Sequence, residues 1–194
     1  MPTFTTLDVE TANHARGSIC QIAMVTYEGG RIVHEWQSLV DPRTHFSSGN
    51  VAVHGIRAAD VRGAPTFAEL WPTIAELAAG RTLVAHNSAF DRSCLAAACA
   101  DVGLAASQTP WLCTVRVARR AWADELPRFG LKAVAAHIGF PFRHHDALED
   151  ARACGAVLLA ACERTGLDVP GWLNRVERPV RERVSPRRRY GHAA

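Results

Sequence analysis

The chain of 194 residues lacks the long apolar segments that a membrane protein requires. None of its apolar runs is longer than Ala156–Cys162, which is far too short to cross a bilayer. Residues Met1–Phe4 show no basic stretch leading into a long apolar one, so the sequence predicts no signal peptide. We therefore expect a cytoplasmic protein with no membrane partner.

Cysteine pairs of the Cys-x-x-Cys type are also missing, although the chain has six cysteines. Five of the six lie beside apolar neighbours, which is typical of small buried thiols in a reducing compartment. A disulfide or a zinc site is a weaker alternative that the spacing leaves open. The six are Cys20, Cys94, Cys99, Cys113, Cys154 and Cys162.

Lysine is almost absent, and Lys132 is the only one. From Glu163 onward, eight arginines oppose four acidic residues, a net +4, which leaves −1 for the rest of a chain whose formal net charge is +3. We divide the chain accordingly into a domain over residues 1–165 and an arginine- and proline-containing tail over residues 166–194. The tail lacks a long apolar period, and we expect it to be partly or wholly flexible.

Hydrophobic periodicity and turn residues predict strands that alternate with helices. Strands are expected at residues 3–9, 19–27, 31–40, 81–85 and 110–114, and helices at 66–79, 88–101, 115–123, 131–138 and 146–165. Gly29 and Gly30 suit a hairpin turn, and a long polar loop is expected over residues 41–55. This order favours an α/β fold, a mixed sheet covered by helices, over an all-α or all-β fold.

Two acidic residues stand in the first predicted strand. Asp8 and Glu10 lie two positions apart, so their carboxylates share one face of the strand. Like charges this close repel each other and lose hydration near a sheet, and a divalent cation would relieve both costs. A strand end that reaches water explains the same residues without any ligand, so this segment alone is a weak indication.

Two helix starts add further acidic residues. Asp91 ends the segment His86–Asp91, which follows the buried strand predicted at residues 81–85. Ser88 and Asp91 also resemble a capping box, and Asn87 is a second candidate for the N-cap.

The other helix start is predicted at Ala147, because Asp146 and Glu149 form a plausible capping box. This places Asp150 one turn into the helix and His145 just outside it. A solvated acidic first turn that complements the helix dipole is the alternative explanation.

Together the three segments offer four carboxylates and one imidazole. Hard oxygen ligands without a Cys or His cluster favour Mg²⁺ or Mn²⁺ over zinc. Two such ions about 3.5–4 Å apart are the usual device for in-line phosphodiester cleavage. A histidine at the rim, with an unperturbed pKa of about 6.5, can accept the proton of an attacking water.

The three segments resemble the motifs of the DnaQ-like, or DEDDh, family of 3′→5′ exonucleases, which includes the proofreading subunit of the bacterial replicative polymerase, ribonuclease T and oligoribonuclease. Asp8-Val9-Glu10-Thr11 matches the first motif, Asp-x-Glu-Thr. His86–Asp91 matches His-Asn-x-x-Phe-Asp. The third motif, His followed by four residues and Asp, selects His145 over His144. The resemblance covers about residues 3–164.

The resemblance implies a ribonuclease-H-like fold, with a five-stranded mixed sheet flanked by helices. It implies that His145 acts as the general base and that two Mg²⁺ or Mn²⁺ ions are held by Asp8, Glu10, Asp91 and Asp150. It also implies that the 3′-terminal nucleotide lies in a pocket lined by Thr11, His54, Asn87 and Phe90. For His54 and Asn87 a loop-bracing role remains open, and for Phe90 a core-packing role.

The expected activity is removal of nucleoside monophosphates from a single-stranded 3′ end, with DNA somewhat favoured over RNA. A binding module that has kept the fold and lost turnover is the alternative. The arginine-rich tail either holds the strand through its charge or is only a solubilising end.

The sequence departs from the family pattern in one motif and lacks one familiar segment. It has Ala12-Asn13 where the family often has Thr-Gly, although asparagine tolerates a left-handed backbone better than most residues. No glutamine-led, leucine-rich sliding-clamp motif is visible, so neither a polymerase nor a homodimer partner is supported by a motif. Proofreading, repair and RNA processing all remain open as the physiological role.

Overall fold

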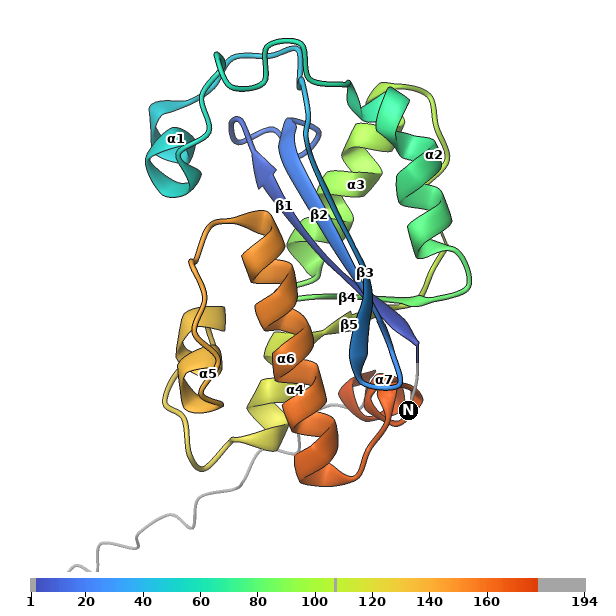
Figure 1. Ribbon diagram of the computed structural model, residues 1–194, viewed down its shortest axis with the longest axis vertical. Helices are drawn as coiled ribbons and strands as arrows, with labels where there is room; N and C mark the ends of the chain where they lie inside the picture. Colours follow the sequence, from blue (N-terminus) through green and yellow to red (C-terminus); the bar gives the residue numbers. More distant parts are fainter. Residues whose placement is uncertain (1–2, 107, 178–194) are drawn as a thin grey trace, which may run out of the picture.

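The computed structural model describes residues 3–106 and 108–177. Its strands are β1 (Phe4–Thr11), β2 (Ile19–Glu28), β3 (Arg31–Leu39), β4 (Thr82–Ala85) and β5 (Trp111–Cys113). They form one sheet in the order β3-β2-β1-β4-β5 (Figure 1). β1, β2 and β3 pair antiparallel, whereas β4 and β5 run parallel to β1, so the predicted mixed sheet is confirmed.

The hairpin between β2 and β3 turns at two glycines with left-handed backbones. Gly29 has a φ of 58° and Gly30 a φ of 82°, a conformation that residues with a side chain rarely adopt. This turn holds two long strands in register, and the sequence predicted it correctly.

Helices cover both faces of the sheet (Figure 1). α2 (Phe67–Ala78) and α3 (Ala89–Asp101) pack on one face. α6 (Ala147–Thr165) lies across the other face, and α4 (Thr114–Ala121) and α5 (Leu131–His137) pack against it.

The alternation of side chains along β1 decides which face each site residue meets. Phe4 belongs to the apolar cluster beneath α6, whereas Leu7 and Val9 belong to the cluster beneath α2 and α3. Asp8 and Glu10 have the same parity as Phe4, so they lie on the α6 face, at the carboxyl end of the strand. The fold therefore carries the acidic residues of the first strand toward the helix that holds Asp150.

The start of α6 is fixed by an N-cap. Asp146 Oδ1 accepts a hydrogen bond from the backbone N–H of Glu149 at 3.3 Å, and the helix begins at Ala147, as predicted. The backbone N–H of Asp150 donates to the Asp146 carbonyl at 2.8 Å. This cap sets the rotation of the first turn and with it the direction of the Asp150 side chain.

The start of α3 differs from the sequence prediction. Ser88 has a helical backbone and no side-chain cap hydrogen bond, so the capping box considered for Ser88 and Asp91 is not formed. Asn87 instead adopts a left-handed backbone with a φ of 75°, and its carbonyl accepts from the N–H of Phe90 at 2.9 Å. Because Asp91 does not serve in a capping box, its carboxylate remains available to the site.

Two segments are helical where the sequence predicted none. α1 (Ser48–His54) lies in the predicted polar loop, and its N-cap Ser47 accepts from the N–H of Asn50 at 3.3 Å. α7 (Val169–Glu177) lies in the predicted tail, and Trp172 is fully buried in the cluster beneath α6. Part of the predicted tail, residues 169–177, is thus a packed helix, and residues 178–194 lie outside the described residues.

All six cysteines are free, and four of them are buried. Burial raises the pKa of Cys20 to about 12 and that of Cys94 to about 11, so these thiols are protonated and unreactive near neutral pH. Within residues 3–106 and 108–177, we find no helix with the length and apolar character that a membrane span requires.

Candidate functional site

Three carboxylates meet at the carboxyl end of β1. Asp8 and Glu10 reach this point from the strand and Asp150 from the first turn of α6, and their oxygens lie within 4.8 Å of one another. We call these three residues the acidic cluster. Hard oxygen donors at this spacing suit a divalent cation such as Mg²⁺ or Mn²⁺.

Asp91 lies next to the acidic cluster but outside the set that shares the 4.8 Å separation. It projects from the first turn of α3, is 2% exposed, and accepts a hydrogen bond from the backbone N–H of Val9. Its charge is the largest Coulombic contribution that raises the pKa of Asp8. Three of the four predicted carboxylates are therefore close enough to share a cation, and the charge of the fourth acts on Asp8 and Glu10.

Burial and mutual repulsion make these carboxylates hard to ionise. Burial is the main cause that holds the pKa of Asp8 well above its usual range, followed by the charges of Asp91, Asp150 and Glu10. Burial raises the pKa of Glu10 to about 7 and that of Asp91 to about 7. Burial also raises the pKa of Asp150. A bound cation would offset this cost. The ionised carboxylates therefore destabilise the cation-free protein and make the site favourable for positive charge.

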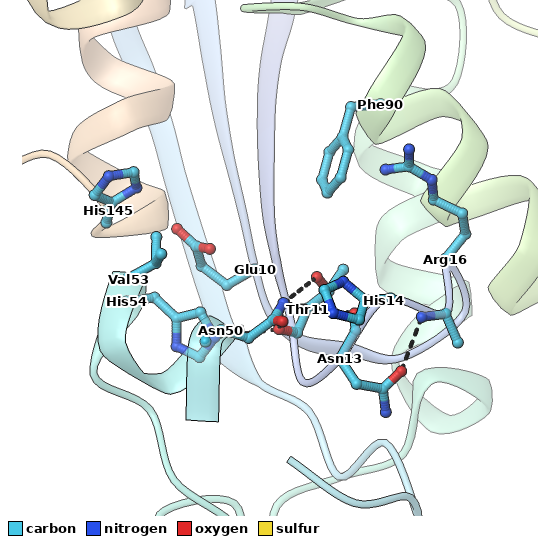
Figure 2. Close-up of a pocket in the computed structure, with 12 residues that line it drawn as sticks. Glu10, Thr11, Asn13, His14, Arg16, Asn50, Val53, His54, Phe90 and His145 are labelled. Atoms are coloured by element: carbon cyan, nitrogen blue, oxygen red, sulfur yellow. Dashed lines mark hydrogen bonds between the residues drawn. The ribbon is translucent and has the colours of Figure 1, made fainter. Parts of the chain in front are cut away.

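Two adjacent histidines border the acidic cluster in different ways. His144 places Nδ1 3.0 and 3.1 Å from the two oxygens of Asp150. The ring of His145 stacks on that of His144 at 3.9 Å and lines the cavity beside Glu10 (Figure 2). Sequence spacing selected His145 and left His144 without a role, yet His144 is the one whose ring contacts Asp150.

The backbone of His145 is left-handed, with a φ of 67°. A residue with a side chain adopts this conformation at a cost of about 1 kcal/mol or more. The backbone N–H of His145 donates to Asp150 Oδ2 at 3.1 Å, which helps to hold the strained residue. Burial and the neighbouring His144 lower the pKa of His145, so its imidazole is neutral near pH 7 and able to accept a proton.

A cavity of about 570 Å³ opens beside the acidic cluster (Figure 2). In Figure 2, His145 and Val53 border it on one side and Phe90 and Arg16 on the other, with Glu10 and Thr11 between them. Its lining residues are Glu10, Thr11, Asn13, His14, Ala15, Arg16, Gly49, Asn50, Val53, His54, Phe90 and His145.

Thr11 is held in place by α1. Asn50 Nδ2 donates to the carbonyl oxygen of Thr11 at 2.8 Å and lies 3.1 Å from its hydroxyl. His54 Nδ1 accepts from the N–H of Ile56 at 3.0 Å, so its proton is on Nε2, which donates to the Thr11 carbonyl at 3.1 Å. His54 therefore lines the cavity and also braces β1.

Asn87 and Phe90 occupy different positions, although they belong to one motif. Phe90 lines the cavity and also packs partly against the cluster beneath α2 and α3, so its position is compatible with both expected roles. Asn87 is exposed and is not among the lining residues. Its left-handed backbone shapes the turn between β4 and α3, which is the bracing role that the sequence left open.

Asn13 replaces the family glycine in a way that the sequence did not indicate. It is not among the residues with a positive φ, so left-handed tolerance is not what it provides. Its Oδ1 accepts from the N–H of Ala15 at 2.8 Å, and its Nδ2 donates to the carbonyl of His45 at 2.8 Å. The asparagine side chain, rather than its backbone, shapes this turn.

Sequence reasoning missed Asn50, Arg16 and His144. Asn50 and Arg16 lie outside the three motifs, so no motif spacing points to them. Asn50 also belongs to α1, which was expected to be a loop. An N-cap signal, Ser47 followed three residues later by Asn50, was present in the sequence and could have indicated α1.

Known proteins share this sequence pattern. The sequence model of the family RNase_T, described as Exonuclease, matches residues 4–158. The chain is 37% identical over 174 residues to a Mycobacterium tuberculosis protein named for a proposed bifunctional exonuclease/endonuclease, a match that covers 84% of this chain and 27% of that protein. It is 31% identical over 158 residues to the PolC-type DNA polymerase III of Clostridium perfringens, covering 80% and 11%. The chain thus spans about a quarter and about a tenth of these relatives.

Solved structures share the fold. Exonuclease X in complex with 5′-overhanging duplex DNA has a TM-score of 0.75 and 26% identity, covering 89% of this chain and 99% of that one. The nuclease domain of 3′hExo, a DEDDh family member bound to rAMP, has a TM-score of 0.73 and 16% identity, covering 84% and 92%. The expected ribonuclease-H-like fold is confirmed.

Proposed function

Because this chain belongs to the exonuclease family RNase_T, of the DEDDh type, we propose that it is a metal-dependent 3′→5′ exonuclease that releases nucleoside monophosphates from single-stranded DNA. The observation that carries the proposal is the acidic cluster, because residues 142 positions apart in the chain bring their carboxylate oxygens within 4.8 Å. A buried group of like charges is costly unless a cation binds there.

The donor set fits two Mg²⁺ or Mn²⁺ ions, which we assign to Asp8, Glu10, Asp91 and Asp150. When bound, such ions stabilise the charge that develops on the phosphoryl and leaving oxygens. Asp150 is oriented for this role by the α6 cap and by His144. The charge of Asp91 raises the pKa of Asp8, as do the charges of Asp150 and Glu10. Asp8 therefore interacts with Asp91 as well as with the other two members of the acidic cluster.

His145 is the group that accepts the proton of the attacking water. It lines the cavity next to Glu10, and its lowered pKa keeps the imidazole neutral near pH 7. Thr11 and Phe90 line the space for the terminal nucleotide, and the Phe90 ring offers a base a surface for stacking. His54 positions Thr11 through a hydrogen bond to its carbonyl, and Asn87 shapes the turn that precedes Phe90.

DNA is the substrate we propose, and the similar proteins support that choice. The PolC-type relatives are DNA polymerases by name, and Exonuclease X was solved with DNA. RNA is the alternative that the assay must separate, because contacts to the 2′-hydroxyl decide this preference.

A degradation assay tests the proposal. Single-stranded DNA and RNA carrying either a 5′ or a 3′ label are incubated with Mg²⁺, Mn²⁺ or EDTA, using wild type, Asp8→Asn and Glu163→Gln. Glu163 is exposed on the same helix as Asp150, about 20 Å farther along, so it controls for the loss of one carboxylate. We expect 5′-labelled DNA to shorten stepwise, 3′-labelled DNA to release the labelled nucleotide at once, and EDTA to stop both.

We expect Asp8→Asn to lower the rate at least about 10³-fold, since metal-ion catalysis contributes several kcal/mol, and Glu163→Gln to match wild type. Equal rates for all three proteins would refute the mechanism. Early release of the 5′ label would reverse the polarity, and faster loss of RNA would change the substrate. Strand binding without turnover at any metal concentration would instead identify a binding module.

A further inference from the structure

The loop between β1 and β2 places one cation at the cavity. Among the described residues that line the cavity, Arg16 is the only lysine or arginine. Its guanidinium carbon lies 4.3 Å from the centre of the Phe90 ring, a cation–π distance. In Figure 2 the guanidinium lies on the side of the ring turned away from Glu10 and His145. A strand that enters the cavity therefore meets the acidic cluster on one side of Phe90 and this cation on the other.

The backbone that carries Arg16 is fixed by its own hydrogen bonds. The N–H of Ala12 donates to the Ser18 carbonyl at 2.8 Å, and the N–H of Ser18 donates to the Ala15 carbonyl at 3.1 Å. Ser18 is buried, and its hydroxyl donates to the Ala15 carbonyl at 2.6 Å. Asn13 ties the same turn to His45. The loop thus presents Arg16 from a preorganised frame, which lowers the entropy cost of a contact.

The known contacts of Arg16 engage only part of its guanidinium. A side-chain hydrogen bond joins it to Cys94, and its guanidinium carbon lies over the Phe90 ring. A guanidinium has five N–H donors, so donors remain for a phosphate, which this group binds in a fork. The side chain is exposed. The ion pairs found within residues 3–106 and 108–177 do not include Arg16, so no carboxylate there holds its charge in a close pair.

We propose that Arg16 binds a phosphate of the nucleic-acid strand other than the scissile one. This inference rests on the proposed function and deepens it. The scissile phosphate must lie at the acidic cluster, whereas Arg16 lies beyond the Phe90 ring and meets the neighbouring part of the backbone. The ring and the guanidinium then act as a pair, with the ring against a base and the cation against a phosphate.

The test compares substrates with one phosphate and with several. Wild type, Arg16→Ala, Arg16→Lys and Arg31→Ala are assayed on (dT)8 and on the p-nitrophenyl ester of thymidine 5′-monophosphate, which has a single phosphate. Arg31 is exposed at the hairpin end of β3, which lies beside the amino end of β1 and therefore at the other end of the sheet from the acidic cluster. It controls for the loss of one positive charge. KM and kcat are measured between 50 and 200 mM salt.

For Arg16→Ala we expect the KM for (dT)8 to rise about tenfold with kcat within twofold, the loss of one charge-assisted contact. The KM for the ester stays unchanged. The slope of log KM against log salt falls in magnitude by about 0.7, the value for one single-strand phosphate. Arg16→Lys keeps most of this slope, and Arg31→Ala matches wild type.

Other results overturn the inference in recognisable ways. An unchanged KM and salt slope for Arg16→Ala, with wild type active, refutes it and leaves the proposed function standing. An equal KM rise on the ester shows that Arg16 only positions Phe90 or Asp91. If wild type turns over no strand, the proposed function fails, and the anisotropy of fluorescein-labelled (dT)8 still decides whether Arg16→Ala weakens binding and lowers the salt slope.

Discussion

The acidic cluster and the pocket wall, which we define as residues 12–18 with α1, border the same cavity but are stabilised in different ways. In the acidic cluster, Asp8, Glu10 and Asp150 have pKa values raised by burial and by one another. In the pocket wall, Asn13 and Asn50 have hydrogen-bond partners for their side chains. The acidic cluster weakens the cation-free protein, whereas the pocket wall stabilises it.

This difference indicates how the two regions should respond to substitution. Removing a carboxylate from the acidic cluster removes chemistry and also relieves repulsion, so activity and stability should move in opposite directions. Removing a side chain from the pocket wall breaks hydrogen bonds that hold the backbone, so stability and substrate affinity should fall together.

Asp150→Asn should give the largest effect. We expect the nuclease rate to fall about 10³-fold, as for loss of a metal ligand. The melting temperature in EDTA should stay the same or rise, because one of three clustered carboxylates is gone while the amide still reaches His144. Calorimetry and the labelled-strand assay measure the two quantities on the same sample. An inactive variant that melts far below wild type would show that Asp150 supports the fold, contrary to the comparison.

The pH dependence of stability tests the same region with a smaller effect. The pKa of Glu10 in the folded protein is about 7, above its unfolded value of about 4.3. A raised carboxyl pKa contributes stability that is complete below the unfolded value and is lost as pH rises through the folded value. In EDTA, the melting temperature should therefore fall between about pH 4 and pH 8 by several degrees, and Mn²⁺ should reverse the fall.

Glu10→Gln isolates the contribution of this carboxylate. Its melting temperature in EDTA should fall less steeply over the same pH range, because the neutral amide neither titrates nor repels Asp8. If the melting temperatures of wild type and the variant fell in parallel with pH, ionisation of Glu10 would not destabilise the folded protein. A flat response of wild type to Mn²⁺ at concentrations that support activity would contradict cation binding at the acidic cluster.

The sequence predicted the elements that local pattern determines. All five strands and five of the helices are near their predicted places, because alternation, helical spacing and Gly29-Gly30 act within a few residues. α1 and α7 were missed because each is short and depends on contacts distant in sequence. α1 has no buried residue and is joined to β1 by the hydrogen bonds of Asn50 and His54, whereas α7 packs against the cluster beneath α6. In α7, Val169, Trp172 and Val176 do have helical spacing, but Pro170 and the surrounding arginines obscured it.

The site divides in the same way. Asp8, Glu10 and Asp150 were predictable, since two share a strand face and the third has a position fixed by a helix cap. Asp91 was found by its motif, but its place outside the 4.8 Å group depends on how α3 packs on the sheet. Arg16 and Asn50 were not predictable, because a loop and a short helix meet there only after the chain has folded.

Asn50→Ala tests the pocket wall and should give the smallest effect. Loss of the donor to the Thr11 carbonyl should cost about 1 kcal/mol, which lowers the melting temperature by about 2–4 °C. KM for (dT)8 should rise about threefold with kcat within twofold, because Thr11 shapes the cavity and does not carry the chemistry. Steady-state kinetics and calorimetry on one preparation provide both measurements.

Two matched variants make this last result decisive. Asn174→Ala removes an exposed asparagine from α7 and should match wild type in both measurements. Asn50→Asp keeps the shape of the side chain but offers the Thr11 carbonyl an acceptor instead of a donor, so its KM should rise further than that of Asn50→Ala. If Asn50→Ala instead loses activity as severely as Asp150→Asn while keeping its stability, the pocket wall takes part in the chemistry, and the contrast between the two regions does not hold.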